Sequence, residues 1–221
     1  MPEGRGWCWP RCWPRIGAKT PSSVPGSCNP EATRALRDRL GRVPEARLED
    51  GGSGLTPTDE GWFVVNVRDA EWWMNESFDA GTRFENQEFE FPQLGFNVSV
   101  IEPGKPNCLY HSENLQEAFL VLSGTCKLLV DGEERDLVPW DFFHCPPGTE
   151  HVFVGTGDKP AVVLMVGARS KDEQLLYPKS ELAAKYGASA EETTPDPKQA
   201  YAPFARSQRG RPESWDRLPW S

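Results

Sequence analysis

The feature that most constrains the fold of this chain is a series of short β-rich runs between residues 61 and 169. The runs expected to form strands cover residues 62–67, 94–102, 117–122, 126–130, 141–145, 152–154 and 161–166. Proline and glycine punctuate the gaps between them, and Asp131-Gly132 between an apolar and an acidic run is a strong hairpin signal. Many short strands at this spacing predict an antiparallel sandwich or small barrel rather than a parallel sheet.

The segment before these runs has a different composition. Residues 1–60 are rich in proline and glycine, and the run WCWPRCWPR at 7–15 has neither a helical nor a strand period. We expect a leader of low order there, with one short helix over residues 30–40. We further hypothesise that residues 1–42 do not belong to the native protein and that Val43 is its first residue. The acid-rich residues 69–90 are expected to form a solvated loop that carries Trp72 and Trp73 inward.

Residues 170–221 form a third region after the barrel of residues 61–169. A helix is predicted from Ser180, which suits an N-cap, to Gly187, which suits a helix stop. The tail beyond it is rich in proline, alanine and charge, and it carries isolated aromatic residues, namely Tyr201, Phe204, Trp215 and Trp220. Such a tail is expected to lie across a surface, and a partner subunit is one candidate for that surface.

Charge and hydropathy exclude several classes of protein. The net charge of −9 argues against a nucleic-acid-binding surface. The longest apolar run, Ala161 to Val166, is too short for a membrane-spanning helix. The N-terminal residues lack the pattern of a secretory signal, so we expect a cytoplasmic protein whose cysteines are free thiols. Cys126 and Cys145 are expected to be small core residues.

All three histidines of the chain lie between residues 111 and 151. His111 and Glu113 stand two residues apart, so on a strand both side chains point to one face. Glu117 begins the next expected strand, and His151 belongs to a third. Imidazole and carboxylate groups that converge inside a barrel suit zinc, iron, manganese or nickel. His144 is expected to be structural or to line a pocket.

Two stretches carry a resemblance to the cupin superfamily, specifically to small single-domain cupins. PGKPNCLYHSENLQEAFLVLSG resembles the first cupin motif, with its residues at Gly104, His111, Glu113, Glu117 and Gly124. WDFFHCPPGTEHVFVG resembles the second motif, with Pro146, Gly148 and His151 in place. The chain departs from the family pattern at Glu113, where the family has its second histidine, and at Trp140 and Gly155, where it has Gly and Asn.

The resemblance implies an all-β fold, an antiparallel cupin (jelly-roll) β-barrel with a short C-terminal helix and an extended tail. It also implies one divalent metal, iron, manganese or zinc, inside the barrel. Its ligands are His111, Glu117, His151 and either Glu113 or an open position. The three-ligand alternative suits ferrous iron and oxygen chemistry, and a metal-free, hydrogen-bonded interior is a further alternative. Glu113 and Glu117 are also candidates for a general base.

Three functions stay open at this point. The first is a metal-dependent enzyme acting on a small molecule, either a dioxygenase or a sugar-type isomerase or epimerase. The second is a non-catalytic module that binds or senses a small ligand, and the third, disfavoured by the small size and acidity of the chain, is a storage barrel. The apolar strand residues Phe119, Val121 and Phe153 favour an apolar or aromatic ligand. Small cupins often dimerise through terminal segments, so a homodimer is expected, with no nucleic-acid or membrane partner.

Overall fold

The computed structural model describes residues 41–221, and the chain divides into two units, Met1–Arg42 and Val43–Ser221. The helix expected over residues 30–40 and the hypothesis about residues 1–42 fall outside the described residues, apart from positions 41 and 42. All elements below belong to the second unit.

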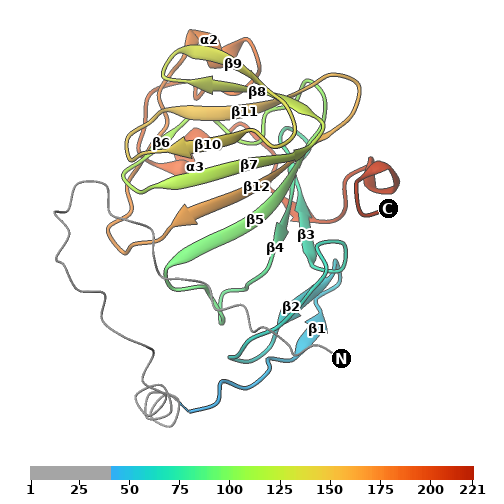
Figure 1. Cartoon of the computed structure of the whole chain (residues 1–221). Helices are drawn as coiled ribbons and strands as arrows, with labels where there is room; N and C mark the ends of the chain where they lie inside the picture. Colours follow the sequence, from blue (N-terminus) through green and yellow to red (C-terminus); the bar gives the residue numbers. More distant parts are fainter. Residues whose placement is uncertain (1–40) are drawn as a thin grey trace, which may run out of the picture. The chain divides into compact units, whose positions relative to one another are not determined.

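Antiparallel strands build this unit (Figure 1). The larger sheet has the order β10-β7-β12-β5-β4-β3-β14, the smaller sheet has the order β11-β8-β9, and two further pairs are β1-β2 and β13-β6. In chain order the strands are β1 (Leu48–Asp50), β2 (Leu55–Pro57), β3 (Glu71–Met74), β4 (Ala80–Arg83), β5 (Leu94–Ile101), β6 (Ser112–Glu113), β7 (Glu117–Ser123), β8 (Thr125–Val130), β9 (Glu133–Leu137), β10 (Phe142–Cys145), β11 (His151–Thr156), β12 (Ala161–Ala168), β13 (Leu175–Leu176) and β14 (Gln208–Arg209). The predicted antiparallel barrel is confirmed.

Six of the seven runs predicted as strands are strands, β5, β7, β8, β10, β11 and β12, with shifts of a few residues at their ends. The Asp131-Gly132 hairpin is confirmed as well, since it joins β8 to β9 with φ of +45° and +80° at its two residues. The inward faces of these strands form the barrel core, which consists of Ile101, Phe119, Val121, Cys126, Leu128, Cys145, Phe153, Ala161 and Val163. Cys126 and Cys145 are therefore core residues, as predicted.

The segment before β5 differs from the prediction in three places. Residues 62–67 are not a strand, because Trp62 forms an isolated bridge and Val64, 83% exposed, contacts no sheet. The leader predicted over 1–60 contains β1 and β2, and the loop predicted over 69–90 contains β3 and β4. These strands are three or four residues long, which is too short for a visible period. The inward position of Trp72 is confirmed, whereas Trp73 is only partly buried and stacks on Arg83.

Three short helices follow the barrel: α2 (Glu181–Ala184), α3 (Pro197–Ala200) and the 3-10 helix η1 (Trp215–Arg217). Ser180 caps α2 as predicted, since its Oγ accepts a hydrogen bond from the Ala183 N–H at 3.2 Å. The helix ends earlier than expected, and Gly187 follows in the left-handed region at φ +68°. In residues 41–221 no helix has the length and apolar character needed to cross a membrane.

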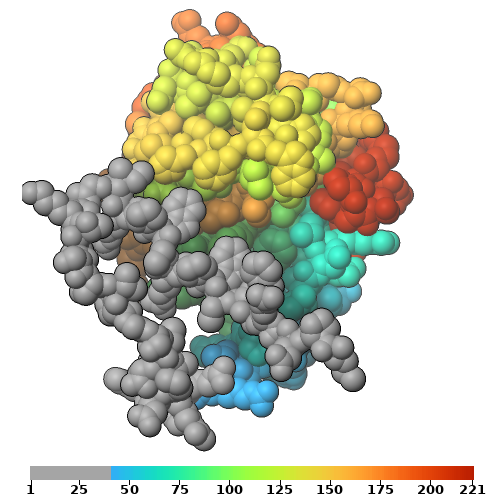
Figure 2. Space-filling view, viewed as in Figure 1, coloured from blue at the N-terminus to red at the C-terminus, as the bar shows by residue number. Residues whose placement is uncertain are grey.

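The aromatic residues of the tail pack within their own chain. Trp215 and Trp220 lie 5.2 and 5.5 Å from Trp72, measured between ring centroids. Tyr201 and Phe204 lie against Phe78, in the same way. Figure 2 shows the last residues, in red, directly beside the cyan region of β3 and β4. These contacts remove the exposed tail aromatics as a reason to expect a homodimer, which stays a prediction.

Trp140 has a strained backbone at the surface. Its φ is +78°, a conformation that costs a non-glycine residue about 1–3 kcal/mol, and its side chain is 74% exposed. We expect Trp140→Gly to stabilise the protein by about 1 kcal/mol, measured by urea unfolding, because glycine removes the strain but also adds freedom to the unfolded chain. Trp140→Ala keeps a Cβ in this conformation and is not expected to stabilise. Equal gains from both variants would contradict the strain argument.

Candidate metal centre

His111 and His151 form the base of the centre, and the backbone places them side by side. The His111 N–H donates to the His151 carbonyl at 3.2 Å, and the His151 N–H donates to the His111 carbonyl at 2.8 Å. Two residues that exchange both hydrogen bonds lie directly opposite each other in an antiparallel pair, so their side chains leave the same face. The imidazole centroids are consequently 4.8 Å apart.

Glu117 reaches the same point from the first residue of β7. Its neighbour across the sheet on β12 is Gly167, where even an added Cβ would come no closer than 3.9 Å to the Glu117 side chain. One ligand atom each from His111, Glu117 and His151 lie within 4.8 Å of one another. Three of the four predicted ligands therefore come together, Glu117 from β7, His151 from β11 and His111 from the bridge opposite His151.

The tautomers of both histidines turn a lone pair toward this point. His111 Nδ1 lies 2.8 Å from the Leu109 carbonyl oxygen, and His151 Nδ1 lies 3.2 Å from the Thr149 carbonyl oxygen. Because a carbonyl oxygen only accepts, each Nδ1 must carry a proton and donate it. For a neutral imidazole this leaves Nε2 as the free acceptor, which is the state in which histidine binds metals.

The pKa values of the three convergent residues are all shifted from their ordinary values. Burial, and then the charge on His111, lowers the pKa of His151 to about 3. Burial and the nearby Glu113 carboxylate raise the pKa of Glu117 to about 7. Burial opposes the imidazolium form of His111, but Cys108, Glu113 and the Leu109 carbonyl outweigh it and leave its pKa well above the ordinary value. Without a metal cation, His111 and Glu117 therefore bind protons more tightly than they do in water.

The buried carboxylate of Glu117 gives an independent test of whether a metal fits. Its Oε2 lies 3.3 Å from His151 Nε2, yet neither atom carries a proton to donate when His151 is neutral and Glu117 is ionised. Among the described residues this oxygen has no hydrogen-bond partner. An unpaired buried carboxylate oxygen beside two Nε2 atoms matches the donor set of a two-histidine, one-carboxylate site for iron, manganese or zinc.

The other predicted residues lie outside the convergent set. Glu113, on β6, is adjacent to it, with its Oε1 3.7 Å from His111 Nε2, and it lines the same cavity. His144 is exposed on the outer face of β10 and lies outside both the centre and the cavity lining. The geometry thus matches the three-ligand alternative, with Glu113 as a neighbouring carboxylate.

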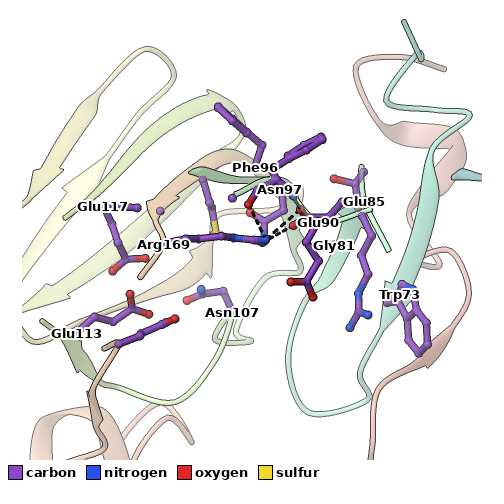
Figure 3. Close-up of a pocket in the computed structure, with 18 of the residues that line it drawn as sticks. Trp73, Gly81, Glu85, Glu90, Phe96, Asn97, Asn107, Glu113, Glu117 and Arg169 are labelled. Atoms are coloured by element: carbon purple, nitrogen blue, oxygen red, sulfur yellow. Dashed lines mark hydrogen bonds and ion pairs between the residues drawn. The ribbon is translucent and has the colours of Figure 1, made fainter. Parts of the chain in front are cut away.

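A cavity of about 1030 Å³ opens beside the centre (Figure 3). Its wall is more polar than the apolar strand residues predicted, because it includes Asn97, Asn107, Glu85, Glu90 and Arg169 in addition to Phe119 and Met165. Sequence reasoning missed Arg169. The signal was its position two residues after Gly167. β12 ends at Ala168, two residues later than the predicted 161–166, and the hydrogen bond from the Arg169 N–H to the Gln93 carbonyl continues the ladder, so both residues leave the same face.

Two tyrosines from the region after the barrel, Tyr177 and Tyr201, contact the residues that carry His111, and the motifs did not predict this. The Tyr177 ring lies 5.8 Å from the His111 ring and 5.6 Å from Tyr201. Tyr201 Oη accepts a hydrogen bond from the Leu109 N–H at 3.1 Å, and the Leu109 carbonyl accepts the proton of His111 Nδ1. A residue of the tail therefore holds the backbone of Leu109, whose carbonyl orients a candidate ligand.

We expect Tyr201→Phe to weaken metal binding about tenfold, because the buried Leu109 N–H loses its acceptor and the carbonyl that orients His111 loses its fixed position. Titration with Zn(II) against a competing chelator measures the change. Tyr186→Phe is the matched control, since Tyr186 makes an exposed hydrogen bond to Glu134. A metal affinity that falls equally in both variants would contradict the role assigned to Tyr201.

Comparison with known proteins places this geometry in a family. Residues 97–167 match the family model of the cupin domain, and this segment contains all three convergent residues. Over 75 residues the chain is 29% identical to a 5-nitrosalicylic acid 1,2-dioxygenase from a Bradyrhizobium species; the match covers 34% of this chain and 36% of the length of that enzyme.

Two solved structures are also similar to parts of this chain, at lower sequence identity. A sugar phosphate isomerase from Silicibacter pomeroyi is 25% identical with a TM-score of 0.48, and the match covers 53% of this chain and 83% of that one. A polyketide cyclase from Streptomyces resistomycificus is 15% identical with a TM-score of 0.43, covering 48% of this chain and 78% of that one. The family-model match lies on the strands that carry the centre, and residues 97–167 of the barrel match the cupin domain.

Proposed function

We propose that the barrel binds one divalent metal ion, ferrous iron in the active form, and that the protein is a dioxygenase of a small hydroxylated aromatic acid. The observation that carries the proposal is the convergence of His111, Glu117 and His151 at the wall of a large cavity. Two histidines and one carboxylate leave coordination positions open, which is the pattern of non-haem iron oxygenases. The similarity to a dioxygenase of 5-nitrosalicylic acid supports the substrate class.

The metal, when bound, supplies a place where the substrate and oxygen are held together and activated. The protein contributes position and proton transfer. Phe119 and Met165 line the cavity beside the centre and give it an apolar surface there. Glu113 stands next to the three ligands and lines the cavity, so its carboxylate is placed to accept a proton from a substrate hydroxyl group.

The test joins elemental analysis with oxygen consumption. The full-length, untagged protein is loaded anaerobically with Fe(II), and oxygen uptake is measured with a panel of salicylates and related hydroxybenzoates. We expect about one equivalent of iron, loss of iron in His111→Ala and His151→Ala, and retention in His144→Ala, whose side chain lies outside the centre.

The outcomes separate the candidate functions. Oxygen uptake that requires both iron and one member of the panel supports the dioxygenase. Stoichiometric iron without uptake across the panel contradicts that activity and favours a ligand-binding cupin. Failure of the wild-type protein to bind iron, manganese or zinc contradicts the metal centre itself.

A further inference from the structure

Arg169 already holds a carboxylate in the cavity. Its Nη1 donates to Glu85 Oε2 at 3.0 Å, its Nη2 contacts Glu85 Oε1, and Nη1 also lies 3.2 Å from the Phe91 carbonyl oxygen (Figure 3). Two parallel contacts between a guanidinium and a carboxylate form the geometry with which arginine recognises any carboxylate group.

The position of Arg169 relative to the centre suits a small ligand. Gly167 lies opposite Glu117, and the sheet ladder continues past β12 through the hydrogen bond from the Arg169 N–H to the Gln93 carbonyl. Arg169 thus leaves the same face as Gly167, and at 3.3–3.4 Å per residue its Cα is about 7 Å further along. Both Arg169 and Glu117 line the cavity (Figure 3). A small ligand in this cavity can therefore contact both side chains.

Arg169 and Glu85 belong to different parts of the fold. Arg169 passes over Gly95, where a Cβ would lie 2.9 Å from Nη2, so the absence of a side chain at Gly95 creates its place on the barrel wall. Glu85 belongs to the segment between β4 and β5, outside any strand, and it also accepts a hydrogen bond from the Phe91 N–H. The guanidinium is therefore part of the barrel, whereas the carboxylate belongs to a connecting segment that can move without breaking a sheet.

The rest of the cavity wall directs an anion to this place. Glu90, Glu113 and Glu173 repel a carboxylate elsewhere in the cavity. Two other cations line the wall. Arg83 stacks over Trp73 on β3, away from the strand that carries Gly167, and Lys171 follows Arg169 by two residues, so it adds positive charge at the same end of the cavity. The Arg169 side chain is 35% exposed and that of Glu85 is 15% exposed, so the arginine is the more accessible partner of the pair.

We propose that Arg169 is the residue that recognises a carboxylate group of the ligand, and that Glu85 occupies this position until the ligand replaces it. This inference rests on the proposed function for the other end of the ligand, and it assigns the residue that binds the acid group of that substrate. Exchange of one carboxylate for another keeps the guanidinium paired. It also releases the Phe91 N–H, whose acceptor leaves with Glu85.

The test uses salicylate and its neutral analogue salicylamide as probes, with binding to the full-length, metal-free protein measured by calorimetry. Arg169→Gln is expected to weaken salicylate binding at least tenfold and to leave salicylamide binding unchanged. Glu85→Gln is expected to tighten salicylate binding at least threefold, because a neutral amide competes less well for the guanidinium. Arg83→Gln is the matched control, in which both affinities stay at the wild-type values.

Two further measurements keep the test decisive. Arg169→Gln leaves the Glu85 carboxylate without its partner. If this variant does not fold for that reason, the double variant Glu85→Gln/Arg169→Gln, which has no unpaired carboxylate, is used instead. Its salicylate affinity is compared with that of Glu85→Gln. Hydrogen exchange of the Phe91 amide is expected to accelerate when salicylate binds to the wild-type protein.

Three results would overturn the inference. They are an unchanged salicylate affinity in Arg169→Gln, a weakened affinity in Glu85→Gln, and an absence of salicylate binding to Glu85→Gln. A separate Fe(II) titration reports on the proposed metal centre, so a failure there is distinguishable from a failure of the Arg169 site.

Discussion

Replacing Glu117 by glutamine is expected to remove the metal from the barrel and, at the same time, to stabilise the metal-free protein at pH 8. Glu117 is the one carboxylate in the convergent set, and a neutral amide is a poor substitute for a charged oxygen ligand. Loss of a residue that merely orients a ligand costs about 10–100-fold in metal affinity, so loss of the ligand is expected to cost at least about 100-fold. Competition titration with Zn(II) or Mn(II) measures it.

The gain in stability follows from the raised pKa of Glu117. Because the pKa is about 7 in the folded state against an ordinary value of 4.5, the native state binds the proton more tightly than the unfolded state does. The stabilising contribution of that proton is complete below pH 4.5 and is lost as the pH rises through 7. The difference corresponds to about 3 kcal/mol at pH 8 and much less at pH 5. Urea unfolding with chelator at both pH values shows whether Glu117→Gln has this pattern.

Glu113→Gln is the matched variant, because it removes a carboxylate that neighbours the three ligands without belonging to their set. We expect its metal affinity to stay within about tenfold of the wild type, the scale of a residue that supports a ligand. If Glu113→Gln loses the metal as completely as Glu117→Gln, four ligands hold it. If Glu117→Gln keeps the metal, the centre is wrongly assigned.

The convergence of three of the predicted residues could be anticipated from the sequence because they lie close together in the chain. Glu117 and His151 are the first residues of β7 and β11, and His111 forms a bridge with His151 directly before β6. Turns mark these boundaries in the sequence, and the alternation of side chains then indicates which face they share. The choice between three and four ligands depends on tertiary structure, which the sequence does not give. Glu113 lies on the expected strand, but β6 pairs with β13, and its carboxylate stays outside the convergent set.

The parts of the site that could not be predicted come from long-range pairing. β3 is four residues long and pairs with β4 and with β14, which is more than 130 residues away in the chain, so no local pattern reveals it. Tyr201 contacts Leu109 across a sequence separation of 92 residues. Such contacts depend on where the tail lies, and isolated aromatic residues without a period do not indicate that.

Trp72→Ala is expected to be among the most destabilising single substitutions in the barrel. The Trp72 side chain is fully buried, its Nε1 donates to the Val67 carbonyl at 3.0 Å, and it packs against Trp215 and Trp220 from the end of the chain. Replacing a buried tryptophan by alanine costs about 3–5 kcal/mol, because it removes apolar burial and leaves a cavity. Trp62→Ala, at a site where the side chain is 51% exposed, is expected to cost less than about 1 kcal/mol.

The same variant tests whether the tail belongs to its own barrel. If Trp215 and Trp220 pack on Trp72 of the same chain, Trp72→Ala frees residues 212–221, and their amides exchange faster at every protein concentration. A tail exchanged between subunits would instead be released on dilution of the wild-type protein, without any substitution. Protection of these amides that depends on protein concentration would contradict the packing described here and would restore the tail as evidence for a homodimer. Protection that is independent of concentration confines any subunit contact to other surfaces of the barrel.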